Sequence, residues 1–176
     1  MEAWRDGDIA SFDVLFDRHK DMLYRYLNRQ TGNHAHAEEV FQEVWTALIK
    51  NRKSYTVRAK FRTYLFHIAH SRLIDYYRQF DKHSALSYEE HDIQSGQVIE
   101  THEQPEGQVD TQHKLASLMQ LLDKLPAAQR EIFLLHEESG LGLSEIAETL
   151  GISRDTVKSR LRYALDKLRK GMRHLS

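Results

Sequence analysis

The stretch that decides the fold is GLSEIAETLGISRDTVKSRLRYALDKLRK, residues 142–170. Its first half has apolar residues at helical spacing and ends at Gly151, which can adopt the left-handed backbone conformation that terminates a helix tightly. Ser153 is a favourable N-cap for a second helix, and Ile152 can fill the corner between the two helices. Ala147 is small where the helices must approach closely. We therefore predict a helix-turn-helix.

The second helix of this motif has one apolar face and one polar, mainly basic face. In DNA-binding proteins, the first residues of such a helix meet base edges, and later lysines and arginines meet phosphates. The alternative is a helical hairpin that only packs, but the glycine, the cap and the one-sided charge favour DNA binding. The apolar face consists of Val157, Leu161, Leu165 and Leu168, and the candidate DNA-contacting residues are Arg154, Asp155, Thr156, Lys158, Ser159, Arg160, Arg162 and Tyr163.

Helical periodicity extends over most of the remaining chain. Asp8 or Ser11 can cap a first helix, and Thr31-Gly32-Asn33 can end it. Pro126 suits the first turn of a later helix. No stretch alternates apolar and polar residues as a half-buried strand does, so we predict an all-α fold. The apolar residues at helical spacing are Ile9, Phe12, Phe16, Leu23 and Leu27; Val40, Val44 and Leu48; Phe61, Leu65, Ile68 and Leu73; and Leu115, Leu118, Leu122 and Leu125.

The net charge is only −1, but the charges are unevenly distributed. Residues 50–80 and 154–176 are mainly basic, whereas residues 81–112 are mainly acidic and lack a sustained period. Each basic block alone is as typical of a solvated helix face as of a nucleic-acid surface. Attraction to phosphates is local, however, so two such blocks indicate nucleic-acid binding. We predict two small helical domains, 1–80 and 113–176, joined by an acidic flexible linker, 81–112.

Composition excludes several classes of protein. No apolar run approaches the ~20 residues of a membrane span, and the N-terminus lacks the basic start and apolar core of a secretion signal. The chain has no cysteine, which excludes disulfides, thiol chemistry and cysteine-ligated zinc. We expect a cytoplasmic protein without membrane insertion, and no fused regulatory domain after Ser176.

With these features in place, the chain from about Asp8 to Leu168 resembles the extracytoplasmic-function (ECF) group of sigma factors, in the sigma-70 family of RNA polymerase subunits. The segments LDKLPAAQREIFLL (122–135) and LSEIAETLGISRDTVKSRL (143–161) are similar to the family's region 4. This resemblance implies that the helix containing residues 153–163 recognises the minus-35 promoter element.

The segment AEEVFQEVWTALI (37–49) is similar to the family's polymerase-binding helix. An exposed acidic face can dock on a basic coiled coil, here that of the polymerase clamp. Without the resemblance, a solvated acidic face would be the commoner explanation. The contacts implied are Glu38, Glu39, Gln42 and Glu43, with Val44 and Trp45 adjoining.

The segment FRTYLFHIAHSRLIDYYRQ (61–79) is similar to the promoter-melting segment of region 2, which reads the minus-10 element. Aromatic and basic side chains can bind the stacking faces and phosphates of unpaired bases. Phe61 and Leu65 are expected to pack internally, and the role of Tyr64 stays open. His67, His70 and Ser71 depart from the family's usual arginines and asparagine. The implied contacts are Phe61, Arg62, Tyr64, His67, Ser71, Asp75 and Arg78.

Three rival functions are weaker. His67 with His70, or His34 with His36, could share a metal, but no third ligand is evident and we expect none. No hydrolase or nucleotide-binding motif occurs, so we expect neither enzyme activity nor a cofactor. A helix-turn-helix regulator that acts without core polymerase would leave the N-terminal helices unexplained. The resemblance implies a sigma factor that directs core RNA polymerase to promoter DNA for transcription initiation, and it allows an anti-sigma factor as a further partner.

Overall fold

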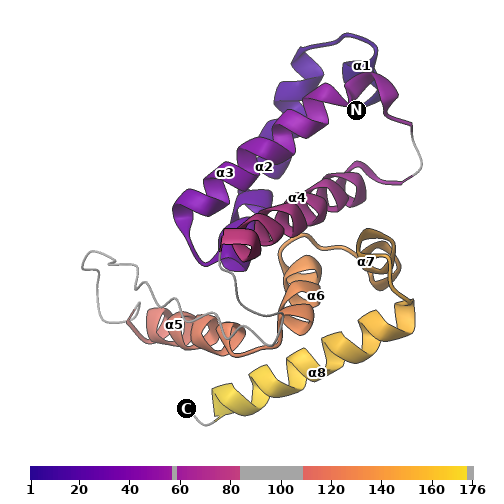
Figure 1. The fold of residues 1–176 in the computed structure, drawn as a ribbon. Helices are drawn as coiled ribbons and strands as arrows, with labels where there is room; N and C mark the ends of the chain where they lie inside the picture. The colour runs from indigo at the N-terminus through magenta and orange to yellow at the C-terminus, as the bar shows by residue number, and fades with distance from the viewer. Residues whose placement is uncertain (57–58, 84–108, 174–176) are drawn as a thin grey trace.

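The protein is described here by a computed structural model that covers residues 1–56, 59–83 and 109–173 (Figure 1). Throughout these ranges the regular structure is helical, which confirms the predicted all-α fold. No helix within them is both long enough and apolar enough to cross a bilayer. The helices are α1 (Glu2–Arg5), α2 (Ala10–Thr31), α3 (His34–Lys50), the short 3-10 helix η1 (Arg52–Ser54), α4 (Phe61–His83), α5 (Val109–Asp123), α6 (Ala127–Glu137), α7 (Leu143–Leu150) and α8 (Arg154–Arg173).

Helices α2, α3 and α4 form the N-terminal part, and local signals set the boundary between α2 and α3. Gly32 adopts a left-handed conformation with φ of 62° and ends α2, as the sequence predicted. The Asn33 side chain then accepts hydrogen bonds from the backbone N–H groups of Ala35 and His36, at 2.9 and 3.2 Å. This cap satisfies two N–H groups that the first turn of α3 leaves unpaired. The two long helices are thereby turned back on each other.

An aromatic cluster closes one end of this part. Phe16 lies 4.9 Å from the Trp45 ring of α3, and Phe12 lies 5.1 Å from Trp4. Trp4 belongs to α1, and the Arg52 guanidinium of η1 lies 5.9 Å from its ring. Neither α1 nor η1 was predicted, because each is too short to show a period. Together they cover aromatic surface that α2 and α3 alone would leave in water.

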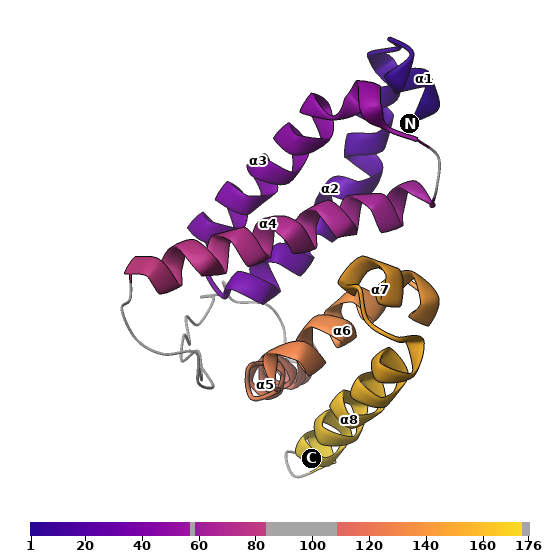
Figure 2. The same cartoon turned by 45° about the vertical axis from the view of Figure 1, so that its right-hand side comes forward.

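The C-terminal part is built around α6, α7 and α8. Buried residues of α6 and α7, including Ile132, Leu135 and Ile146, pack against Val157 and Leu161 of α8. Helix α5 lies along the other end of α8, as both views show (Figures 1 and 2). Gly171 fits this close approach, since a Cβ there would clash with Leu121 Cδ2 and the Leu121 side chain would have to move. That contact sets the close approach of α5 and α8.

Two predicted core residues are in fact exposed. Ile9 precedes the first turn of α2 and is 73% exposed, while Leu115 is 51% exposed near the start of α5. Both have the correct helical spacing, but neither has another helix packed over it. The predicted linker also begins later and ends earlier, because α4 continues to His83 and α5 begins at Val109. Residues 84–108, the rest of that linker, lie outside the described residues.

The two parts of the chain lie directly against each other. Helix α7 lies beside α4, and α6 lies beside α2, whereas α8 occupies the side facing away from α4 (Figure 2). The buried apolar side chains of the two parts belong to one contiguous cluster. The prediction of two domains joined by a linker did not include a contact between them. This contact determines which surfaces of each part are open to partners.

Candidate nucleic-acid and polymerase interfaces

The turn between α7 and α8 has the geometry expected of a helix-turn-helix. Gly151 ends α7 in the left-handed conformation, with φ of 66°. The Ile152 N–H then donates to the Ala147 carbonyl at 3.1 Å. The Ser153 hydroxyl accepts a hydrogen bond from the Thr156 N–H at 3.1 Å, which caps α8 as predicted. Consequently, the first turn of α8 is held firmly on its support.

Helix α8 presents its predicted DNA-contacting residues outward. Val157, Ala164 and Leu168 are buried, which fixes the rotation of the helix. Tyr163 is 52% exposed, and the Arg162 guanidinium lies 5.2 Å from its ring. Such a face can enter a groove without rearrangement of the C-terminal part. Of the predicted residues, Arg154, Asp155, Lys158, Arg162 and Tyr163 are exposed, and Thr156, Ser159 and Arg160 are half-buried.

Helix α3 carries an acidic outer face. Glu38, Glu39, Gln42 and Glu43 are all exposed, as a docking surface requires. The two adjoining residues in the predicted set are different, because Val44 and Trp45 are buried in the core of the N-terminal part. Val44 is thus buried as its place in the apolar stripe of this helix predicted, and both residues hold α3 in place. Helical periodicity puts Val44 on the side opposite the glutamates and Trp45 at the edge of their face.

Helix α4 has a mixed face of aromatic and basic residues. Arg62, His67, Ser71 and Arg78 are exposed, and Asp75 is half-buried, with Arg72 at 3.5 Å. The packing expected of Phe61 and Leu65 is also observed: Leu65 is buried, and Phe61 is half-buried, with its ring 5.1 Å from His19.

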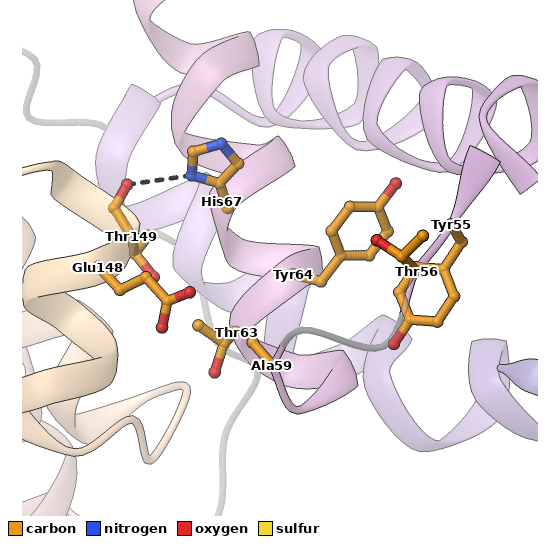
Figure 3. Close-up of a pocket in the computed structure, with 8 residues that line it drawn as sticks. All are labelled: Tyr55, Thr56, Ala59, Thr63, Tyr64, His67, Glu148 and Thr149. Atoms are coloured by element: carbon orange, nitrogen blue, oxygen red, sulfur yellow. Dashed lines mark hydrogen bonds between the residues drawn. The ribbon is translucent and has the colours of Figure 1, made fainter.

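Beside this face lies a cavity of about 340 Å³ between α4 and α7 (Figure 3). Tyr64 stands on one side of it with Tyr55, their ring centroids 5.0 Å apart. Burial raises the pKa of both hydroxyls, so both tyrosines stay neutral at physiological pH. On the other side, the His67 ring is within 3.3 Å of the Thr149 carbonyl of α7. The aromatic wall of Tyr55 and Tyr64 suits a planar ligand such as a nucleobase.

Of the eight residues that line this cavity, only Tyr64 and His67 were among the predicted contacts, and Thr63 and Tyr55 are two of the six that were not. Thr63 is buried and donates a hydrogen bond to Glu145 of α7 at 3.3 Å. Tyr55 is an aromatic residue within a run of cations, and that composition was a signal available in the sequence. No local sequence pattern predicts the contact of Thr63, because its partner Glu145 lies 82 residues away along the chain.

Both histidines of the pair on α4 contact the C-terminal part. His67 faces the Thr149 carbonyl, and His70 Nδ1 lies 2.6 Å from Glu131 Oε1 of α6. Over the described ranges, no three His, Asp or Glu side chains are grouped as metal binding would require. Both histidines therefore belong to the contact between the two parts.

Comparison with known families identifies both parts. Residues 15–83 match the model for sigma-70 region 2, and residues 115–168 match that for sigma-70 region 4. The ECF RNA polymerase sigma factor SigW of Bacillus subtilis is 30% identical over 97% of this chain and 94% of its own length. The ECF RNA polymerase sigma factor SigL of Mycobacterium tuberculosis is 31% identical over 96% of this chain and 93% of its own.

Two solved structures share the fold over almost the whole chain. One is the sigma factor RpoE of Bartonella quintana in complex with the anti-sigma factor NepR, with a TM-score of 0.72 at 19% identity, covering 94% of this chain and 98% of that one. The other is CnrH in complex with the cytosolic domain of CnrY, with a TM-score of 0.69 at 22% identity, covering 98% and 94%. At this identity, the likeness concerns the fold alone.

Proposed function

Since this chain belongs to the extracytoplasmic-function group of the sigma-70 family, whose members direct core RNA polymerase to promoters, we propose that it performs this task through three separate helical surfaces. One surface binds the polymerase and two bind the promoter. The observation that carries the proposal is the outward face of α8, which presents Arg154, Lys158, Arg162 and Tyr163 on a capped helix-turn-helix.

In this proposal α8 reads the minus-35 element in the major groove. Its first residues, Arg154 to Lys158, meet base edges, and Arg160 and Arg162 meet phosphates. The buried residues Val157 and Leu161 keep this face rigid. A rigid recognition helix avoids the entropic cost of ordering side chains and backbone on binding.

Helix α3 docks on the clamp coiled coil of core polymerase through its acidic face. Glu38, Glu39 and Glu43 attract a basic partner, and Gln42 adds a neutral hydrogen-bonding group between them. Trp45 and Val44 act indirectly, because their burial fixes the rotation of α3.

Helix α4 captures the opened minus-10 element. Arg62 and Arg78 are exposed cations for phosphates, and Tyr64 with Tyr55 offers an aromatic wall for an unstacked base. His67, Ser71 and Asp75 supply polar groups along the same helix. Phe61 supports the start of this helix from within, through its contact with His19.

The remaining features complete the proposal. The chain acts in the cytoplasm, where its polymerase is, and it has no covalent chemistry of its own because the polymerase makes the RNA. We further propose an anti-sigma factor as a partner, since one protein of the same fold, the sigma factor RpoE, has been solved with the anti-sigma factor NepR.

The test is run-off transcription with core enzyme, combined with a pull-down of core. Arg162→Ala is expected to reduce promoter use about tenfold, because one lost bidentate or phosphate contact costs roughly 1–3 kcal/mol. Core binding should be retained. The matched control is Arg169→Ala, an exposed arginine later on the same helix that lies 3.9 Å from Asp166. Equal loss in both variants would contradict a direct contact between Arg162 and the promoter.

The polymerase surface is tested in the same assay. The double variant Glu39→Lys with Glu43→Lys should lose core binding, while Arg162→Ala keeps it. If wild-type protein selected its DNA site without core enzyme, it would be a regulator that acts without core polymerase instead.

A further inference from the structure

Three glutamates of the C-terminal part reach across to the N-terminal part. Glu131, Glu138 and Glu145 are spaced seven residues apart in the chain. Glu131 lies 2.6 Å from His70 Nδ1 and 3.5 Å from the Tyr26 hydroxyl. These contacts join α6 to α4 and α2, so they bridge segments that are distant in the sequence.

Glu138 contacts two arginines of α2. Its carboxylate accepts a hydrogen bond from Arg25 Nε at 3.0 Å and also pairs with Arg29 Nη1. Its side chain is only 10% exposed. A carboxylate so far removed from water requires opposite charge beside it, and here two guanidiniums of α2 provide that charge.

Glu145 secures the other end of the contact. One of its oxygens lies 3.3 Å from both Lys60 Nζ and the Thr63 hydroxyl, and the other accepts the Gly142 N–H at 2.9 Å. The Gly142 hydrogen bond, followed by the interactions with Lys60 and Thr63, lowers the pKa of Glu145. The carboxylate is therefore ionised at neutral pH and pairs with a cation of the N-terminal part.

The face covered in this way overlaps the face proposed to bind the minus-10 strand. Thr63, Tyr64 and His67 line the cavity that Glu148 and Thr149 of α7 close from the opposite side (Figure 3). A Cβ at Gly140, in the loop before α7, would lie 3.1 Å from Arg62 Nη1, so this loop also lies on that face. With α7 in this position the part of the α4 face at Thr63 and Tyr64 is covered, whereas Ser71 and Arg78 stay exposed.

We propose that Arg25 and Arg29 of α2 extend the strand-binding surface of α4, and that Glu131, Glu138 and Glu145 form an intramolecular latch that occupies this surface until nucleic acid displaces it. The proposal rests on the proposed function of α4 and adds its regulation. The ligand class is the phosphate backbone of single-stranded DNA. Its anionic oxygens can accept hydrogen bonds from Arg25 and Arg29, as the Glu138 carboxylate does in the closed protein.

The latch has a quantitative consequence. If only the open fraction of molecules can bind a strand, the apparent affinity is the intrinsic affinity multiplied by that fraction. Weakening the latch must then raise both the open fraction and the apparent affinity. A variant that only damaged folding would lower the affinity instead.

The first experiment measures opening in the full chain without DNA. Because the chain has no cysteine, a donor and an acceptor dye can be attached at Thr46→Cys on α3 and Lys167→Cys on α8, both exposed. Glu138→Gln is expected to lower the energy-transfer efficiency. Glu137→Gln, the exposed neighbour that pairs with His136, is the matched control and should leave it unchanged. Equal efficiency in wild type and Glu138→Gln overturns the latch.

Circular dichroism checks that Glu138→Gln remains folded. If its helical signal is lost, Arg29→Gln breaks the same pair from the other side and is measured in its place. Loss of energy transfer in Arg29→Gln then supports the latch, and wild-type efficiency overturns it.

The second experiment measures binding of a short single-stranded oligothymidylate. Glu138→Gln should bind it at least about threefold more tightly than wild type or Glu137→Gln, in proportion to its open fraction. Adding Arg25→Gln and Arg29→Gln to Glu138→Gln should reduce the slope of log affinity against log salt by about 1.4, since each phosphate contact to a single strand contributes about 0.7. Lys20→Gln, which removes a cation paired with Asp17 on the same helix, is the control.

Opening without a gain in affinity, or an unchanged salt slope, overturns the proposal. The proposed function fails separately, since it is read from run-off transcription by wild-type holoenzyme. Suppose that the holoenzyme initiates at promoters, but wild type and Glu138→Gln bind the strand equally well. The latch proposal is then rejected, and the proposed function stands.

Discussion

His19 shows how a single residue couples the N-terminal part to pH. Its Nδ1 is buried without a hydrogen-bond partner among the described residues, and its ring packs on Phe61 at 5.1 Å. Burial lowers the pKa of His19, and the positive charges of Arg62 and Arg18 lower it further. The folded protein therefore favours neutral His19.

The sign of the resulting pH dependence follows from proton linkage. Between the lowered folded pKa and the unfolded value of about 6.5, the unfolded chain binds more protons. The free energy of unfolding should therefore fall as the pH drops from about 6.5 through the folded pKa. His19→Leu should show a shallower decline in denaturant titrations at pH 7 and pH 5.5, whereas His34→Leu, at an exposed position, should keep the wild-type decline. An unchanged slope in His19→Leu would rule out this role.

At the scale of elements, the turn between α7 and α8 sets the angle of the recognition helix. The sequence predicted this turn from Gly151 and Ser153, and the structure has both the left-handed glycine and the cap. The same kind of local signal ended α2 at Gly32. Both turns were predictable because their determinants lie within a few residues of each other.

Gly151→Ala should destabilise the protein by about 1 kcal/mol, because an L-residue in a left-handed conformation costs roughly 1–2 kcal/mol. The cost is backbone strain alone, since a Cβ at Gly151 would meet nothing within 4 Å. Urea unfolding measures it. The control is Gly142→Ala, where φ is −74° and a Cβ would make an ordinary contact with Glu145. Equal destabilisation of the two variants would show that φ is not the cause.

At the scale of the whole molecule, the contact between the two parts combines buried apolar groups with ion pairs whose cations are partly or largely exposed and whose carboxylates are more buried. The side chain of Arg25 is 54% exposed and that of Lys60 is 81% exposed, so salt can screen their pairs with Glu138 and Glu145. The two hydrophobic interiors are not screened in this way. Ionic strength should therefore act on the arrangement of the parts before it acts on their folds.

Raising the salt concentration from about 0.05 M to about 0.5 M should lower the energy transfer between dyes on α3 and α8, because the Debye length falls below about 8 Å. The helical signal in circular dichroism should not change. Glu138→Gln should respond less to salt, since its principal ion pair is already absent. An equal salt response in both proteins would assign the effect to other charges.

The sequence alone determined the all-α fold, the helix-turn-helix and the family, because helical period, caps and turn glycines act over a few residues. It also selected the exposed acidic face of α3 and the outer face of α8. It misjudged Ile9 and Leu115, since spacing shows which residues share a face but not what packs against that face. Even so, each of these errors concerns one side chain.

The packing of the C-terminal part on α2 and α4 was decided only in the tertiary structure. The Arg25–Glu138 pair joins residues 113 positions apart, and the His70–Glu131 pair joins residues 61 apart. Nothing in the sequence distinguishes these four residues from ordinary polar residues on a solvated helix face. Such pairs depend on the three-dimensional path of the whole chain, and no local pattern of residues encodes that path.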